Sequence, residues 1–153
     1  MPWGHWLGPA ICVASVSALA APAGSSTAVA SVPTERDTHT AECVAALDMS
    51  TRQLAAQLKG GQDALRPVLL ARLKSGAAFI GSAYLAGERD KARTKAMLEA
   101  ALEAQKALPK AELDTRQVAC EAEGSRLLSG ASALERAVVD RVAAKRMEKL
   151  LKK

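Results

Sequence analysis

The sequence predicts an all-α protein of four or five antiparallel helices, closed by one disulfide bond. The chain is rich in Ala, Leu, Glu, Lys, Arg and Gln, which all favour helix. It lacks the runs of Val, Ile, Thr and aromatic residues that form strands. Its apolar residues recur at spacings of three and four, and a length of 153 residues suits a single domain.

The N-terminal segment resembles a secretory signal peptide. Its first 34 residues contain no ionised side chain, and Leu7–Ala23 is an apolar run of mostly small residues. Small residues at positions −3 and −1 favour cleavage after Ala20 or Ala23, with Ala30 as a later option. We therefore expect residues 1–23 to be removed on export to the periplasm, although the start of the segment lacks Lys and Arg. Gly and Pro interrupt the run, which argues against an uncleaved membrane anchor.

Two cysteines remain after such a cleavage, because Cys12 lies in the leader. An exported protein meets an oxidising environment, where an even number of cysteines suits a disulfide. We expect a bond between Cys43 and Cys120, which would close a loop of 76 residues (44–119). A loop of that size is expected to add about 4 kcal/mol to the free energy of unfolding. Two free thiols or a redox pair are the alternatives, but no CxxC motif is present.

A stretch rich in Ser, Thr and Ala, residues 24–37, should form a flexible lead-in to a single helical domain, residues 38–153. The first helix should begin near Thr38 and end at Lys59, before two glycines. Cys43 lies beside its apolar stripe, on a face with Leu47 and Leu54. The members of the stripe recur every three or four residues: Val44, Leu47, Thr51, Leu54 and Leu58.

The second helix should run from about Asp63 to Ala86, with Asp63 as its N-cap and Pro67 in its first turn. Ala77 and Gly81 are small residues four apart, which suggests a close contact with another helix. The stripe that should face the core consists of Leu65, Leu69, Leu73, Gly76, Ile80 and Ala83.

A third helix should cover about Arg89–Ala107, and Pro109 should end it and begin a fourth. The fourth helix should break at Gly130, because Ser132–Glu135 has the S-x-x-E form of a capping box. The last helix would then cover residues 132–151. The alternative is one helix of about forty residues with a kink at Gly130.

A short internal repeat relates Gly81–Gly87 (GSAYLAG) to Gly124–Gly130 (GSRLLSG). In each copy the second Gly would lie at the turn of a helical hairpin. Residues 77–105 also resemble a tetratricopeptide or Sel1-type repeat, and the matching residues are Ile80, Gly81, Tyr84, Gly87, Asp90, Ala92, Ala100 and Ala101. That resemblance implies a helical hairpin, in which Gly admits the partner helix, and a protein-interaction role. Independent use of glycine-capped hairpins is the alternative, since the second copy lacks the Tyr.

No group of residues predicts an enzyme, and we expect no catalytic residues, no metal ligands and no cofactor. After the leader the only histidine is His39, which forms an i, i+4 pair with Cys43. Two ligands are too few for a metal. The serines have no histidine nearby to act as a base, and no glycine-rich phosphate loop follows a strand. Nucleic acid is not an expected partner, because the chain lacks an aromatic stacking platform.

The segment from Arg136 to Lys153, most of which lies in the last helix, holds the whole excess of positive charge. The chain has a net charge of +5, and residues 136–153 carry seven cations against Asp140 and Glu148. These cations form the candidate interaction surface: Arg136, Arg141, Lys145, Arg146, Lys149, Lys152 and Lys153. The same helix carries an apolar stripe: Leu134, Val138, Val142, Met147, Leu150 and Leu151. Such a helix can dock on an acidic partner or lie on an anionic membrane, or its cations can simply complement the helix dipole while the stripe covers the bundle.

We therefore expect an exported, periplasmic protein without enzymatic activity, with a protein-interaction or structural role. One alternative is a carrier that holds a small apolar ligand between its helices, lined by Phe79, Ile80, Tyr84 and Met97. Another is a protein of the anionic membrane surface. An enlarged internal cavity would favour the carrier, whereas a filled core with an exposed apolar stripe near Val138 to Leu151 would favour partner binding.

Overall fold

The computed structural model describes residues 32–152, so the expected signal peptide and Lys153 lie outside the described residues. Within that range the chain is helical and has no strand, which confirms the predicted fold class. The elements in chain order are α1 (Glu35–Lys59), the 3₁₀ turn η1 (Asp63–Leu65), α2 (Arg66–Leu85), α3 (Lys91–Lys106), α4 (Lys110–Gly130) and α5 (Ala133–Lys152).

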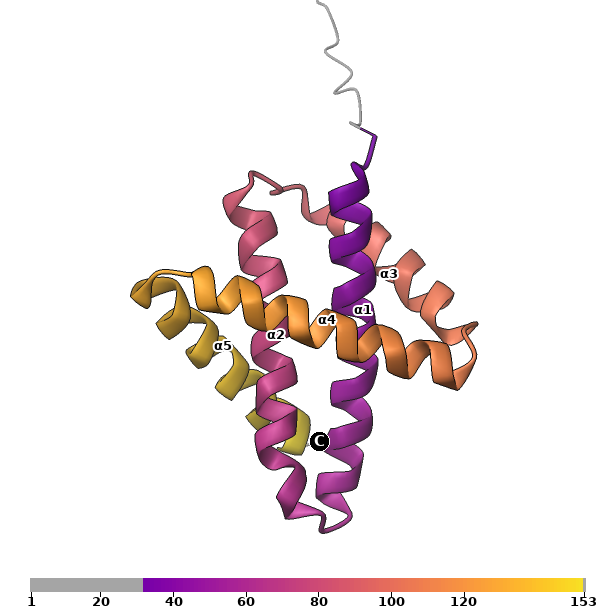
Figure 1. The fold of residues 1–153 in the computed structure, drawn as a ribbon, viewed down its shortest axis with the longest axis vertical. Helices are drawn as coiled ribbons and strands as arrows, with labels where there is room; N and C mark the ends of the chain where they lie inside the picture. The colour runs from indigo at the N-terminus through magenta and orange to yellow at the C-terminus, as the bar shows by residue number, and fades with distance from the viewer. Residues whose placement is uncertain (1–31, 153) are drawn as a thin grey trace, which may run out of the picture. The chain divides into compact units, whose positions relative to one another are not determined.

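Helices α1 and α2 form a hairpin, and the other three helices pack on it (Figure 1). Helix α3 packs against α1, α5 packs mainly against α2, and α4 contacts both α1 and α2. Figure 1 shows α1 and α2 running in opposite directions, while α4 lies across them. The antiparallel arrangement that we expected for all the helices is therefore not confirmed.

Two clusters of buried side chains join these helices. The first lies around the disulfide and contains Cys43, Leu47, Phe79 and Cys120. The second lies nearer the turn between α1 and α2 and contains Leu54, Ala55, Leu58 and Leu69. Small side chains let the helices approach closely, and Ala45 and Ala46 are fully buried. The predicted stripe of the first helix is thus largely the core.

Helix α1 begins earlier than predicted, at Glu35 and not near Thr38. The cause is a capping box that the sequence pattern did not reveal, because its third helical residue is Asp37 in place of Glu or Gln. The Thr34 hydroxyl accepts a hydrogen bond from the Asp37 amide at 3.1 Å, and the Asp37 carboxylate accepts one from the Thr34 amide at 3.0 Å. These two bonds satisfy amide groups that the end of a helix leaves without partners.

The next two helices also begin at different residues from those predicted. Asp63 opens a 3₁₀ turn and does not cap a helix, so its predicted role is wrong; α2 starts at Arg66, with Pro67 in its first turn as expected. Helix α3 starts after Asp90, whose carboxylate accepts hydrogen bonds from the amides of residues 92 and 93, both at 3.0 Å. Asp90 is therefore the N-cap of α3, a position at which short polar side chains are preferred.

The chain breaks between α4 and α5 where the capping-box pattern predicted. The Glu135 carboxylate accepts a hydrogen bond from the Ser132 amide at 2.6 Å, and the Ser132 hydroxyl accepts one from the Glu135 amide at 3.3 Å. The alternative of one long kinked helix is wrong.

The glycines of the internal repeat have different roles in its two copies. Gly87 has a φ of 100° after α2, the left-handed conformation expected for a turn, whereas Gly130 is the last residue of α4 and is not left-handed. A Cβ atom at Gly81 would meet nothing within 4 Å, so the close contact predicted there is wrong. Such a contact exists instead at Gly124, which lies against Ser75.

The segment Asp63–Leu85 is long and apolar enough to cross a membrane, judged by length and composition alone. In this fold the same segment contacts three other helices, α1, α4 and α5. Three of its apolar side chains, Leu69, Ala78 and Phe79, are buried in the core. Its composition thus also suits the central helix of a helical domain.

Candidate functional site: the outward side of the last helix

Helix α5 is held to the domain by one side. Val139 and Ala143 on that side are buried, and Met147, Leu150 and Leu151 pack against the leucine cluster at the α1–α2 turn. Their spacing of three and four residues places them on one side of a helix. The second half of the predicted stripe is therefore bundle cover.

The first half of the stripe faces solvent. Leu134 exposes 76% of its area, Val138 54% and Val142 51%. Positions 134, 138 and 142 follow one another at intervals of four, so they form one row. The stripe that we expected to be continuous is thus divided between two sides of α5, and within residues 32–152 its three exposed members keep more than half of their area accessible to solvent.

Three of the seven predicted interaction cations bind other groups of the chain, and a fourth lies outside the described residues. Arg146 donates a hydrogen bond to Asp48 of α1 at 3.1 Å and so ties α5 to the core hairpin. The Lys152 ammonium lies 3.8 Å from the Glu148 carboxylate, one helical turn earlier. The Arg136 guanidinium donates to the carbonyl of residue 131, just before α5. Lys153 lies outside the described residues.

The other three cations, Arg141, Lys145 and Lys149, are exposed. Among the carboxylates in residues 32–152, none lies within ion-pair distance of these three. Lys145 follows Leu134 by eleven residues, and Lys149 follows Val138 by the same interval. Eleven residues make about three helical turns, or about 16 Å, so the cations lie on the same side as the aliphatic row and further along the helix.

We call this surface the outward face of α5. It consists of Leu134, Val138, Arg141, Val142, Lys145 and Lys149. Two aliphatic residues begin it, Arg141 and Val142 lie at its middle, and two lysines end it. Hydrogen bonds from the Ser132 hydroxyl and amide fix the start of the helix beside Leu134 and lower the pKa of the Glu135 carboxyl. The negative charge that this favours also suits a helix N-terminus.

The long-range partners of α5 were missed by sequence reasoning. Arg146 pairs with Asp48, which is 98 residues away in the chain, and Lys74 pairs with Asp140 at 2.7 Å. No local pattern links residues at such separations. The sequence alone could therefore not distinguish the cations of α5 that pair with other groups from the three that have no carboxylate partner within residues 32–152.

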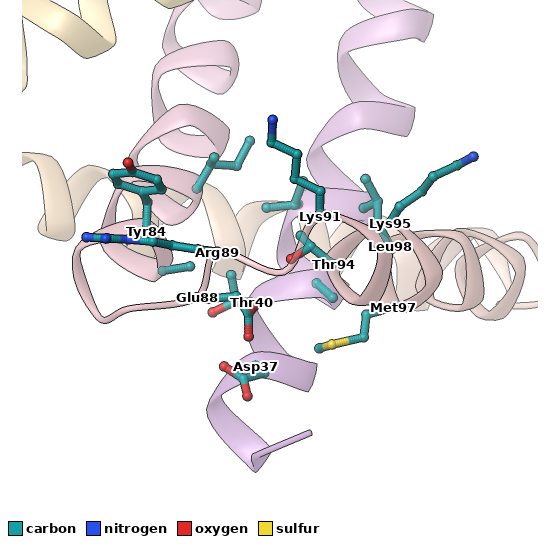
Figure 2. A pocket seen from close by; sticks show the side chains of 14 residues that line it. Asp37, Thr40, Tyr84, Glu88, Arg89, Lys91, Thr94, Lys95, Met97 and Leu98 are labelled. Carbon is teal, nitrogen blue, oxygen red and sulfur yellow. The ribbon is translucent and has the colours of Figure 1, made fainter. Parts of the chain in front are cut away.

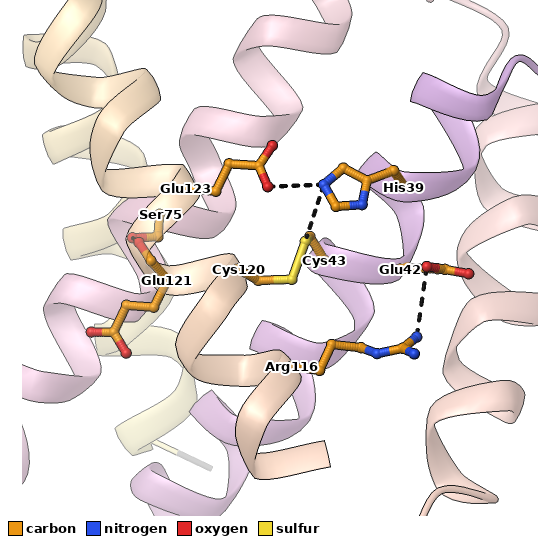
Figure 3. The surroundings of a disulfide bond; sticks show 8 residues. All are labelled: His39, Glu42, Cys43, Ser75, Arg116, Cys120, Glu121 and Glu123. Atoms are coloured by element: carbon orange, nitrogen blue, oxygen red, sulfur yellow. Dashed lines mark hydrogen bonds and ion pairs between the residues drawn. A yellow bond between two sulfur atoms is a disulfide. The ribbon is translucent and has the colours of Figure 1, made fainter. Parts of the chain in front are cut away.

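The disulfide joins α1 to α4 as predicted, between Cys43 and Cys120 (Figure 3). Both cysteines are buried. Beside them His39 Nε2 lies 2.9 Å from a Glu123 carboxylate oxygen and 3.9 Å from Cys43 Sγ. The three donor atoms would suit a metal by proximity, but Cys43 has no thiolate to offer because its sulfur is bonded to Cys120. Two donors then remain, too few for a metal centre.

A groove of about 430 Å³ opens between α1, α2, α3 and the loop from α2 to α3 (Figure 2). Three of the four residues named for a carrier line it: Ile80, Tyr84 and Met97. The fourth, Phe79, is buried beside the disulfide. The space lies at the surface of the domain and not inside its core, so it differs from the internal cavity that a carrier was expected to have. No family model matches this chain, and no curated protein or solved structure is significantly similar to it.

Proposed function

We propose that the chain is an exported, non-enzymatic helical protein that binds an acidic protein partner through the outward face of α5. The observation that carries this proposal is a combination on one side of one helix: three exposed aliphatic side chains and three cations that have no carboxylate partner within residues 32–152. Buried apolar contact supplies most of the affinity of a protein interface, while complementary charge supplies orientation and a faster association.

Export is proposed because the N-terminal segment resembles a signal peptide. The disulfide suits that compartment, since such bonds persist in oxidising environments such as the periplasm. The buried core clusters and the exposed row at 134, 138 and 142 support partner binding, although the part of the stripe nearest Leu151 packs on the core.

A protein partner is favoured over a membrane by the order of residues along α5. An interfacial helix needs a broad apolar side with cations at its borders, and it usually carries Trp, Phe or Leu there. In the outward face the aliphatic and cationic residues follow one another along the same side, and none of the six is aromatic. The complementary surface is an apolar patch beside a row of carboxylates, which a protein can present.

The first test is site-specific photo-crosslinking in intact cells, with the photoreactive residue at position 138. We compare the unaltered chain with Arg141→Glu/Lys145→Glu. The control is Lys106→Glu/Lys110→Glu, which changes net charge equally at two exposed lysines, also four apart, on α3 and α4. We expect one partner, joined through an acidic segment, that the α5 variant loses and the control retains.

The partner should then be purified and its affinity measured at several salt concentrations. We expect the Kd to rise with ionic strength, because salt screens charge pairs at the rim of an interface. Equal capture by both variants would overturn the assignment to α5. Sedimentation of the chain with phosphatidylglycerol vesicles but not phosphatidylcholine vesicles, without a crosslinked protein, would replace the protein partner by a membrane.

A further inference from the structure

The groove beside α3 is apolar along its floor and walls. Ala41 and Val44 of α1 form its floor, Ile80 and Tyr84 of α2 form one wall, and Leu98 belongs to the opposite wall on α3. The Ile80 and Tyr84 side chains keep 58% and 57% of their areas exposed. Helix α3 packs mainly on α1, so nothing within residues 32–152 covers this side of α2. The volume of about 430 Å³ lies within the range of small-molecule pockets.

The carboxylates that line the groove are already engaged. Asp37 lies 3.0 Å from the Arg93 guanidinium, and Glu88 lies 3.9 Å from the same group. The Asp37 carboxylate also accepts a hydrogen bond from the Thr34 amide. Neither acid is therefore left to receive a cationic ligand.

The cations that line the groove are less fully compensated. The Arg89 guanidinium lies over the Tyr84 ring, 5.1 Å from its centroid. Lys95 lies 3.7 Å from Glu99, and both side chains are mostly exposed, so this pair is weak. Lys91 pairs with no carboxylate in the described part of the chain. The residues that line the groove include three cations, Arg89, Lys91 and Lys95, and two carboxylates, so the lining carries one excess positive charge.

We propose that this groove binds the anion of a single-chain fatty carboxylic acid. The alkyl chain lies over Val44, Ile80 and Leu98, and the carboxylate reaches Lys91 and Lys95. Figure 2 shows these two lysines on the side of the groove away from Asp37. A head group with a single negative charge matches the excess of one positive charge, and the apolar lining favours a chain without polar groups. This site is separate from the outward face of α5.

Tyr84 gives a direct readout. It is the only tyrosine of the chain, and both tryptophans, Trp3 and Trp6, lie in the leader that we expect to be cleaved. The protein purified from the periplasm is titrated with dodecanoate below its micelle concentration, by tyrosine fluorescence and by calorimetry. We expect one dodecanoate per chain. Dodecyltrimethylammonium should bind at least about tenfold more weakly, which corresponds to about 1.4 kcal/mol.

Two variants of exposed apolar residues on α2 form a matched pair. Ile80→Gln places an amide in the groove, whereas Leu85→Gln makes the same kind of change at a residue that is 68% exposed and does not line it. We expect Ile80→Gln to weaken dodecanoate binding about tenfold or more and Leu85→Gln to leave it unchanged. Circular dichroism checks that both variants keep their helices.

A second pair of substitutions tests the charge. Lys91→Gln/Lys95→Gln should remove the preference for dodecanoate over dodecyltrimethylammonium. Equal binding of the two amphiphiles by the unaltered chain would overturn the assignment of a carboxylate. Absence of saturable binding would overturn the site itself. A dimer whose Tyr84 does not respond to dodecanoate would do the same, because a second copy of the chain would then fill the groove.

Discussion

Gly124 of α4 lies so close to Ser75 of α2 that a Cβ atom at position 124 would be 2.6 Å from the Ser75 Cβ. The same atom would lie 2.8 Å from the Ser75 carbonyl oxygen. The Ser75 hydroxyl donates a hydrogen bond to the carbonyl of Glu121 at 3.2 Å, so the two helices also exchange a polar contact here. This crossing fixes the separation of α2 and α4, because backbone atoms cannot move aside as a flexible side chain can.

Gly124→Ala should therefore lower the free energy of unfolding by about 1–3 kcal/mol, the usual cost of overpacking a tight site. Urea denaturation measures the change. Gly81→Ala is the matched control, since it lies within α2 and its Cβ would meet nothing within 4 Å. That variant should be unchanged or more stable by about 0.5–1 kcal/mol, because Ala favours helix over Gly. Equal stability of the two variants would contradict the close crossing.

Removal of the disulfide, by Cys43→Ala/Cys120→Ala, should lower the free energy of unfolding by about 4 kcal/mol. The bond links residues 77 apart in the chain, so its loss frees a long loop in the unfolded state. Denaturation with and without dithiothreitol provides the measurement. The reductant should destabilise the unaltered chain and have no effect on the double variant; an effect on both would show that it acts elsewhere.

Replacing Gln105 by an apolar residue should make the protein more stable. Its side chain is fully buried, and among the described residues neither its amide nitrogen nor its amide oxygen has a hydrogen-bond partner. Gln105→Met keeps the length of the side chain and removes these polar atoms, so the free energy of unfolding should rise by about 1–2 kcal/mol. Gln53→Met, at an exposed position of α1, should change little. A loss of stability in Gln105→Met would mean that the amide is satisfied in solution.

The first turn of α1 should depend on pH through Asp37. Hydrogen bonds from the backbone and hydroxyl of Thr34, and then the charge of Arg93, lower the pKa of its carboxyl below the usual 3.8. A lowered pKa stabilises the fold at pH values above the ordinary one, and this contribution disappears as the pH falls through the lowered value. The stability difference between the unaltered chain and Asp37→Ala should thus be largest near neutral pH and shrink in strong acid. A difference independent of pH would refute the role of the ionised carboxylate.

Local signals in the sequence predicted the helix ends that depend on neighbouring residues. The Ser132–Glu135 capping box marked the break before α5, and an even cysteine count after the leader gave the Cys43–Cys120 bond. The start of α1 was missed because Asp37 performs the task that Glu or Gln usually performs in a capping box. The two capping boxes concern residues three positions apart, whereas the disulfide, which joins residues 77 apart, followed from the number of cysteines and not from a local pattern.

The groove could not be predicted, because it depends on where whole helices lie. Ile80 shares a helical stripe with Leu69, and spacing alone assigned both to the core. Leu69 is fully buried, but Ile80 is 58% exposed, because α3 packs on α1 and leaves that end of α2 uncovered. Periodicity identifies the side of a helix that is apolar, but not whether another helix covers its full length.

The Cys43–Cys120 bond also determines how the chain would respond to a mechanical load. A force applied to its two ends bypasses the segment between the cysteines, which includes all of α2 and α3, because the load crosses the bond instead. Helix α5 lies outside this covalent ring, and side-chain contacts hold it against α1 and α2. A pull would therefore peel α5 away first, uncovering the leucines around Leu69, while the ring stays shielded for as long as the bond remains oxidised.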